Sequence, residues 1–180
     1  MRRVAIVGSS GAGKSTLARI LADRLGSPRL ELDAIYHQSG WTPLPQPEFR
    51  ARVHEFAGHD AWVIDGNYSH VRDLVLARAD TVIWLRLPRR VVMRQVLRRT
   101  SARLFRRREL WNGNRESLRN VLSLDPERSI VAWAWKMHGK YDEDYAAVVA
   151  QAPAGQQWVV LRSRRQVRAF LTGPSSAGRR

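Results

Sequence analysis

The residues with the clearest chemistry form a glycine-rich loop near the start of the chain. The run GSSGAGKS at residues 8–15 matches the pattern G-x-x-x-x-G-K-[ST] at every fixed position, directly after an apolar run. In such a loop, backbone N–H groups turn inward toward phosphate oxygens, and the helix that follows adds the positive end of its dipole. The loop therefore predicts a site for ATP, with GTP as the less favoured alternative. Its nucleotide-binding residues are Gly8, Ser9, Ser10, Gly11, Ala12, Gly13, Lys14, Ser15 and Thr16.

Individual side chains of this loop have separate expected roles. Lys14 is expected to reach the β- and γ-phosphates and to act in catalysis, and the hydroxyl of Ser15 is expected to bind Mg²⁺. Thr16 offers a further hydroxyl near the α-phosphate. ATP and Mg²⁺ are therefore the predicted cofactors.

Two aspartates follow short apolar runs farther along the chain. Asp33 comes after the run at residues 29–32, and Asp65 ends the run WVID. Ligands of an open α/β sheet bind outside the carboxyl ends of its strands. Asp65 fits a Walker B position that holds Mg²⁺ directly or through a water. Asp33 lies where a general base, or a group that grips an acceptor hydroxyl, would stand. The alternative for both is an aspartate that caps a helix or lies in a turn.

Aromatic and polar residues near these aspartates allow two interpretations. Tyr36, Trp41, Asn67 and Tyr68 could form the wall of an acceptor pocket, or they could be ordinary packing residues. The histidines are scattered without a metal-binding spacing, so we interpret them as structural. They are His37, His54, His59, His70 and His138.

An arginine block lies between residues 98 and 119. Arg99, Arg103 and Arg107 are spaced four apart, so on a helix they would share one face and repel one another unless an anion lay among them. Such a block suits a lid that closes over a transferring phosphoryl group. A solvated basic face and a nucleic-acid patch are the alternatives. The arginine block comprises Arg98, Arg99, Arg103, Arg106, Arg107, Arg108, Arg115 and Arg119.

Composition limits the class of protein. The chain has 180 residues, a net charge of +15, a hydrophobic share of 44% and no cysteine. All but three of its 31 basic residues are arginines. No apolar run approaches the roughly 20 residues of a membrane span, so we expect a cytosolic protein without a membrane partner. The charge indicates an anionic partner, and nothing in the sequence indicates an oligomeric state.

The elements that must position these residues alternate between strands and helices. Strands are expected at residues 4–7, 29–32, 62–64, 81–87 and 158–161, with helices after the loop, from Pro47, from Pro88, after Pro126 and up to Leu171. This alternation predicts an α/β fold, with a parallel sheet and helices on both faces. We expect a single domain at residues 1–172, an inserted lid at about 97–124 and a disordered tail at 173–180.

Several segments together resemble the adenylate-kinase-related P-loop kinases often labelled topology modulation proteins. They are GSSGAGKST, LELDAIYHQSGW, WVIDGNYS, TVIWLRLPR and VVLRSRRQVRAFL, and the resemblance extends from Val4 to Leu171. It implies the three-layer sandwich of P-loop NTPases, with a five-stranded parallel sheet in the order 2-3-1-4-5 and a lid between the fourth strand and the last.

The resemblance also carries implications for single residues. Arg99 and Arg103 stand where these kinases have lid arginines, and Ser163, Arg164 and Arg165 where a loop packs on adenine. IDGN replaces the D-G-F-P-R segment of adenylate kinase and lacks its Phe-Pro-Arg part, which puts an AMP acceptor in doubt. The segment around Asp33 is more similar to that of shikimate and gluconate kinases, where an aspartate meets the acceptor hydroxyl.

The sequence thus predicts a Mg²⁺-dependent phosphotransferase that moves the γ-phosphate of ATP to a small molecule, either nucleotide-like or a hydroxyl metabolite. A kinase-like toxin would carry the same residues. The alternative from another class is an ATP-dependent nucleic-acid-binding or regulatory protein, for which the arginine block would be the contact surface.

Overall fold

The computed structural model describes residues 1–105, 109–114, 125 and 129–173. Much of the expected lid, including Arg106, Arg107, Arg108, Arg115 and Arg119, lies outside the described residues, as does the tail from residue 174. None of the described helices has the length and apolarity needed to span a bilayer.

Five strands form one parallel sheet in the order β2-β3-β1-β4-β5. The central strands are apolar runs buried on both faces, as is typical of parallel sheets covered by helices. The α/β class and the strand order expected from the sequence are confirmed. The strands are β1 (Arg3–Gly8), β2 (Arg29–Glu31), β3 (Trp62–Asp65), β4 (Thr81–Leu85) and β5 (Gln157–Leu161).

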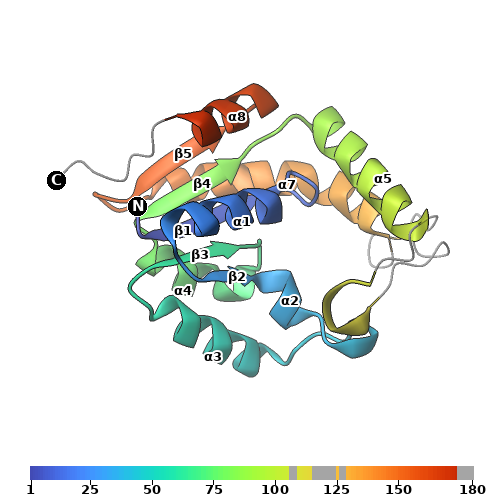
Figure 1. Cartoon of the computed structure of the whole chain (residues 1–180), viewed down its shortest axis with the longest axis horizontal. Helices are drawn as coiled ribbons and strands as arrows, with labels where there is room; N and C mark the ends of the chain where they lie inside the picture. Colours follow the sequence, from blue (N-terminus) through green and yellow to red (C-terminus); the bar gives the residue numbers. More distant parts are fainter. Residues whose placement is uncertain (106–108, 115–124, 126–128, 174–180) are drawn as a thin grey trace.

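Helices cover both faces of the sheet and complete three layers (Figure 1). On one face α3, α4 and α7 pack against alternate strand residues such as Trp62 and Trp84. On the other face α1, α8 and the first turns of α5 pack against Val4, Ile6 and Ile83. The helices are α1 (Lys14–Leu25), α2 (Leu32–Tyr36), α3 (Gln46–Ala57), α4 (Ser69–Arg78), α5 (Arg89–Phe105), α7 (Ile130–Ala150) and α8 (Arg164–Thr172), with 3-10 turns η1 (Ser39–Trp41) and η2 (Trp111–Gly113).

The structure differs from the expected elements at three places. The second strand stops at Glu31, because the short helix α2 begins at Leu32. At the end of this helix the N–H of His37 donates to the carbonyl of Asp33. Strand β4 ends at Leu85, two residues earlier than expected. Helix α4 was not predicted, because the segment is weakly amphipathic and buries only Val71 and Val75, which gives little helical periodicity in the sequence.

Helix α5 joins the sheet to the expected lid. It runs without a break from Arg89 to Phe105, so the lid boundary expected at residue 97 falls inside a helix. A Cβ atom at Gly11 would lie 2.3 Å from the Cγ2 of Val96. Helix α5 therefore packs directly against the phosphate loop, and only glycine fits at this position of the loop.

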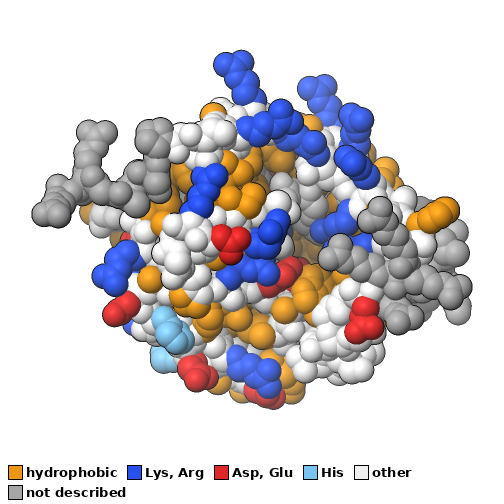
Figure 2. Space-filling view, viewed as in Figure 1, with side chains coloured by type: hydrophobic (Ala, Val, Ile, Leu, Met, Phe, Trp, Pro, Cys, Tyr) orange, Lys and Arg blue, Asp and Glu red, His pale blue; other side chains and the backbone are white. Residues whose placement is uncertain are grey.

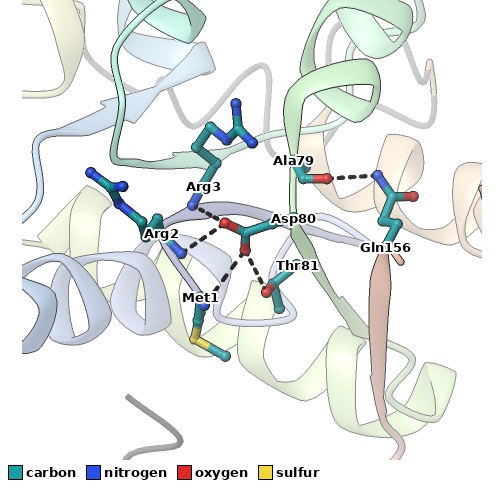
Figure 3. A network of polar contacts seen from close by, with 7 residues as sticks. All are labelled: Met1, Arg2, Arg3, Ala79, Asp80, Thr81 and Gln156. Carbon is teal, nitrogen blue, oxygen red and sulfur yellow. Dashed lines mark hydrogen bonds and ion pairs between the residues drawn. The ribbon is translucent and has the colours of Figure 1, made fainter. Parts of the chain in front are cut away.

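A polar network joins β1 to β4 at the amino ends of the strands (Figure 3). The carboxylate of Asp80 accepts hydrogen bonds from the N–H groups of Arg2 and Arg3, both at 2.9 Å, and from the hydroxyl of Thr81 at 2.7 Å. The charged amino terminus lies 3.9 Å away. Burial acts to raise the pKa of Asp80, but these hydrogen bonds outweigh it, and the net shift is downward.

Candidate active site

The phosphate loop leaves β1 at Gly8 and enters α1 at Lys14. Gly8, Gly11 and Gly13 have φ values of 140°, 81° and 98°, which favour glycine. At Gly8 a Cβ would also lie 2.6 Å from the carbonyl oxygen of Leu85. The side chain of Lys14 folds over the loop, and its Nζ donates to the carbonyls of Gly8 at 2.8 Å and Ser9 at 3.2 Å.

The charge environment of Lys14 includes three other residues that the sequence analysis singled out. Burial lowers the pKa of Lys14, while the charges of Asp33 and Asp65 raise it. The positive charge of Arg99 lowers the same pKa further. Three other residues singled out in the sequence, Asp33, Asp65 and Arg99, therefore lie close enough to Lys14 to act on its charge.

Ser15 and Asp65 form the predicted metal position. The Oγ of Ser15 lies 2.7 Å from the Oδ2 of Asp65 and 2.9 Å from the Oε1 of Glu31, and its single hydrogen can be donated to one of them at a time. Asp65 is only 2% exposed, and burial raises its pKa to about 6 although the Ser15 hydrogen bond opposes the shift.

One oxygen of this position is available to a cation. The buried Oδ1 of Asp65 has no hydrogen-bond partner among the described residues, and the guanidinium of Arg29 lies 3.7 Å away from it. No group of three or more His, Asp or Glu side chains in the described ranges could hold a metal unaided. Mg²⁺ is commonly bound by one or two protein oxygens together with substrate phosphates, so Ser15 and Asp65 fit that ion.

Glu31 and Arg29 belong to the site, and the sequence analysis did not identify them. Arg29 donates to the carbonyl of Ser15 at 3.1 Å and lies 3.5 Å from Glu31. Glu31 is the last residue of β2, two positions before Asp33. Its place at the carboxyl end of a short strand could have indicated it, because ligands of such sheets bind at that edge.

Asn67 supports the loop. Its Oδ1 accepts hydrogen bonds from the N–H of Gly8 and from the hydroxyl of Tyr145, both at 3.1 Å. Its Nδ2 donates back to the carbonyl of Gly8. Asn67 therefore fixes the first residue of the phosphate loop to the segment that follows β3.

Asp33 lies in the first turn of α2 and faces aromatic residues. The hydroxyl of Tyr68 donates to its Oδ1 at 2.6 Å and lies 3.4 Å from the Nε2 of His37. Burial and the charge of Asp33 raise the pKa of Tyr68, so this hydroxyl keeps its proton. Burial lowers the pKa of His37, and Asp33 opposes that shift. His37, which we had interpreted as structural, thus lies beside a candidate catalytic carboxylate.

The segment at residues 111–114 closes this side of the site. The Nδ2 of Asn112 donates to the carbonyl of Ala34 at 3.1 Å and to that of His37. The side chain of Asn114 donates to the carbonyl of Gln38 and accepts from the N–H of Trp41, both at 2.9 Å. The ring of Trp111 stacks on His37 with centroids 5.9 Å apart.

The remaining predicted residues lie on α5, at the start of α8 and on α1. Arg99 and Arg103 are one turn apart on α5, and both are partly buried. Ser163 caps α8, since its hydroxyl accepts from the N–H of Gln166 at 3.2 Å, and Arg164 is the first residue of that helix. Thr16 is exposed on α1.

Solved structures share this fold over almost the whole chain. A shikimate kinase from Acinetobacter baumannii in complex with shikimate matches with a TM-score of 0.55 and 16% identity, covering 95% of this chain and 89% of that one. A gluconokinase from Sinorhizobium meliloti 1021 matches with a TM-score of 0.54 and 18% identity, covering 94% and 91%.

A shikimate kinase from Bacteroides thetaiotaomicron matches with a TM-score of 0.51 and 17% identity, covering 94% of each chain. No protein-family model and no curated protein matches the sequence. At these identities the likeness establishes the fold alone, and this fold is the one that the sequence resemblance implied.

Proposed function

We propose that this protein is a Mg²⁺-dependent kinase that transfers the γ-phosphate of ATP to a hydroxyl group of a small molecule. The observation that carries the proposal is the position of Lys14 over the phosphate loop, where the charges of Asp33, Asp65 and Arg99 all act on it. A phosphate-binding lysine beside two carboxylates and an arginine is the set of groups that phosphoryl transfer to an alcohol requires.

The chemistry of the transfer assigns a role to each group. The acceptor oxygen attacks the γ-phosphorus, the bond to the β–γ bridging oxygen breaks, and ADP leaves. Asp33 orients the acceptor hydroxyl and takes its proton. Lys14 and the loop N–H groups hold the phosphates, while Arg99 and Arg103 offset the charge on the transferring group.

Mg²⁺, when bound, neutralises charge on the β- and γ-phosphates, and Ser15 and Asp65 are the residues that would hold it. We further propose that Ser163 and Arg164 contact the adenine, that residues 97–124 act as a lid, and that the protein works in the cytosol.

A phosphorylation screen tests this function. Purified protein with Mg²⁺ and γ-labelled ATP is offered nucleosides, nucleoside monophosphates, sugar acids and small hydroxy acids. We expect label in one class of acceptor and about a thousandfold slower labelling with Lys14→Ala. ATP hydrolysis without transfer to any class would contradict a kinase.

A second candidate is nucleic-acid binding, and it is favoured by the distribution of charge. Residues 81–105 and 145–173 contain no aspartate or glutamate. Figure 2 shows basic side chains gathered over α5 and α8. The apolar side of α8, with Val167 and Phe170, packs against the core, and both side chains are partly buried. The exposed arginines of this face are Arg89, Arg90, Arg94, Arg98, Arg162, Arg164, Arg165 and Arg168.

The dependence on salt concentration distinguishes the two candidate functions. Binding that neutralises several phosphates of a nucleic acid weakens about a thousandfold between about 50 and 200 mM salt. Labelled single- and double-stranded DNA and RNA should show that slope if the basic face is a nucleic-acid surface. Transfer to a small acceptor in an enclosed site should change much less, because that site is screened less.

A further inference from the structure

We propose that Asn67 and Tyr145 are positioning residues of the phosphate loop, and that through Gly8 they set the place of the Lys14 ammonium group. This inference rests on the proposed kinase function, because it concerns how the same site holds the phosphates of ATP. The contacts that carry it join the end of β1, the turn after β3 and the second half of α7.

The first residue of the phosphate loop has a neighbouring strand on one side only. Strand β4 pairs with β1 as far as Gly8, but β3 pairs with β1 only as far as Ile6. The carbonyl of Ile6 accepts from the N–H of Gly66 at 3.3 Å, just after β3 has ended. Because Gly8 is buried, its backbone groups on the β3 side need partners from outside the sheet.

The side-chain amide of Asn67 takes the place of the missing strand. Its Oδ1 accepts from the N–H of Gly8 at 3.1 Å, and its Nδ2 donates to the carbonyl of the same residue. Among side chains of this length only the amide offers both groups, since a carboxylate lacks the donor and an aliphatic chain lacks donor and acceptor. Asn67 therefore fixes the peptide groups on both sides of the Gly8 Cα.

Tyr145 holds that amide in its orientation. Its hydroxyl donates to the Oδ1 of Asn67 at 3.1 Å, from a position 78 residues away along the chain. Tyr145 is 1% exposed, and its ring lies 5.0 Å from the guanidinium of Arg72 and 6.0 Å from the ring of Trp84. Burial raises the pKa of the Tyr145 hydroxyl, so the hydroxyl keeps the proton that it donates.

The carbonyl that Asn67 holds is also a contact of the candidate catalytic lysine. The Nζ of Lys14 donates to the carbonyls of Gly8 at 2.8 Å and Ser9 at 3.2 Å. An ammonium group has three hydrogens, so these two bonds leave one hydrogen for a phosphate oxygen. The Gly8 carbonyl therefore helps to set the position of the ammonium group. A loop that is fixed before ATP arrives loses less conformational freedom on binding, which favours both affinity and transfer.

A double-mutant cycle tests the inference without an acceptor, with the affinity for Mg²⁺-ATP measured by calorimetric titration. We expect Tyr145→Phe to weaken binding about fivefold, as loss of one neutral hydrogen bond does, and Asn67→Ala about thirtyfold, since it removes two. In the Asn67→Ala background, Tyr145→Phe should change the affinity less than about twofold, because Tyr145 acts through Asn67. Equal losses from Tyr145→Phe in both backgrounds, or no loss in Asn67→Ala, would overturn the inference.

A core variant separates positioning from stability. Val53 on α3 is fully buried in the same core cluster as Tyr145, and its apolar side chain makes no hydrogen bond. We expect Val53→Ala to lower the free energy of unfolding in a denaturant titration and to leave the affinity for Mg²⁺-ATP unchanged. A loss of affinity in Val53→Ala as large as that in Tyr145→Phe would show that general stability controls binding, and would overturn the inference.

The transfer reaction provides an independent arm. With an acceptor from the screen and saturating ATP, Asn67→Ala should lower kcat about tenfold and leave the KM for the acceptor within about twofold, because Lys14 acts on the phosphates. A KM for the acceptor that rises while kcat stays constant would contradict action through Lys14. A wild-type protein that binds Mg²⁺-ATP but transfers phosphate to no acceptor would count against the proposed function, and the binding cycle would still decide the inference.

Discussion

The phosphate side and the acceptor side of the site are built in different ways. The phosphate side is a short continuous loop, in which Lys14 contacts carbonyls five and six residues away. The acceptor side is assembled from distant segments, because Tyr68 and Asp33 are 35 residues apart and Asn114 and Trp41 are 73 apart. The first arrangement suits the ATP that we propose as an invariable ligand, and the second leaves recognition of the proposed acceptor to side chains that can vary without altering the loop.

The largest effect should come from removal of the lysine on the phosphate side. Lys14→Ala takes away a partly buried cation from the phosphate oxygens, and we expect transfer to fall about a thousandfold. The measurement is the initial rate with labelled ATP. Lys140→Ala is the matched control, because Lys140 is exposed on α7 and should leave the rate unchanged. Equal losses of rate in both variants would show that Lys14 has no specific role in catalysis.

The next effect concerns the metal position. Asp65→Asn should weaken Mg²⁺-dependent ATP binding about a hundredfold, since ligand and supporting groups of metal sites typically contribute that much. Calorimetric titration with and without Mg²⁺ measures it. The fold should tolerate the change, because burial already raises the pKa of Asp65 to about 6 and disfavours its charge. Unaltered Mg²⁺ dependence would remove Asp65 from the metal site.

A smaller effect should appear on the acceptor side. Tyr68→Phe removes the hydrogen bond to Asp33, and a bond to a charged group contributes about 1.5 kcal/mol, or about tenfold in rate. We expect kcat with an acceptor from the screen to fall while the affinity for ATP stays the same. Tyr36→Phe, in the same aromatic group, should be close to wild type. A Tyr68→Phe variant that loses ATP binding would show that the two sides are not separate.

The smallest effect lies away from both sides. Asp80→Asn should lower the free energy of unfolding by about 1 kcal/mol, because the carboxylate holds two N–H groups but is partly exposed to solvent. The pKa of Asp80 is lowered in the fold, so this contribution is present above its ordinary pKa of 3.8 and is lost as the pH falls through the lowered value. Denaturant titrations at pH 7 and pH 3 measure it, and transfer activity should not change.

The contrast between the two sides also explains what could be predicted from the sequence. The loop, Lys14, Ser15 and Asp65 were found because their chemistry follows from type and spacing along a few residues, and the structure brings them together. The fold class followed from the alternation of apolar runs. The bonds of Asn67, Tyr68 and Asn112 depend on segments that meet only after folding, and no local pattern indicates them. Glu31 was overlooked because the strand was expected to continue to Leu32, so that Asp33 was taken as the acid at its end.

The direct test of the account is a comparison of ATP affinity and transfer rate in Asp33→Asn. If Asp33 serves the acceptor and the loop serves ATP, the variant should bind Mg²⁺-ATP as wild type does and should transfer phosphate to the acceptor at least about a hundredfold more slowly. Transfer at the wild-type rate with unchanged ATP binding would contradict a catalytic role for Asp33. A large loss of ATP affinity would contradict the division of the site into two sides.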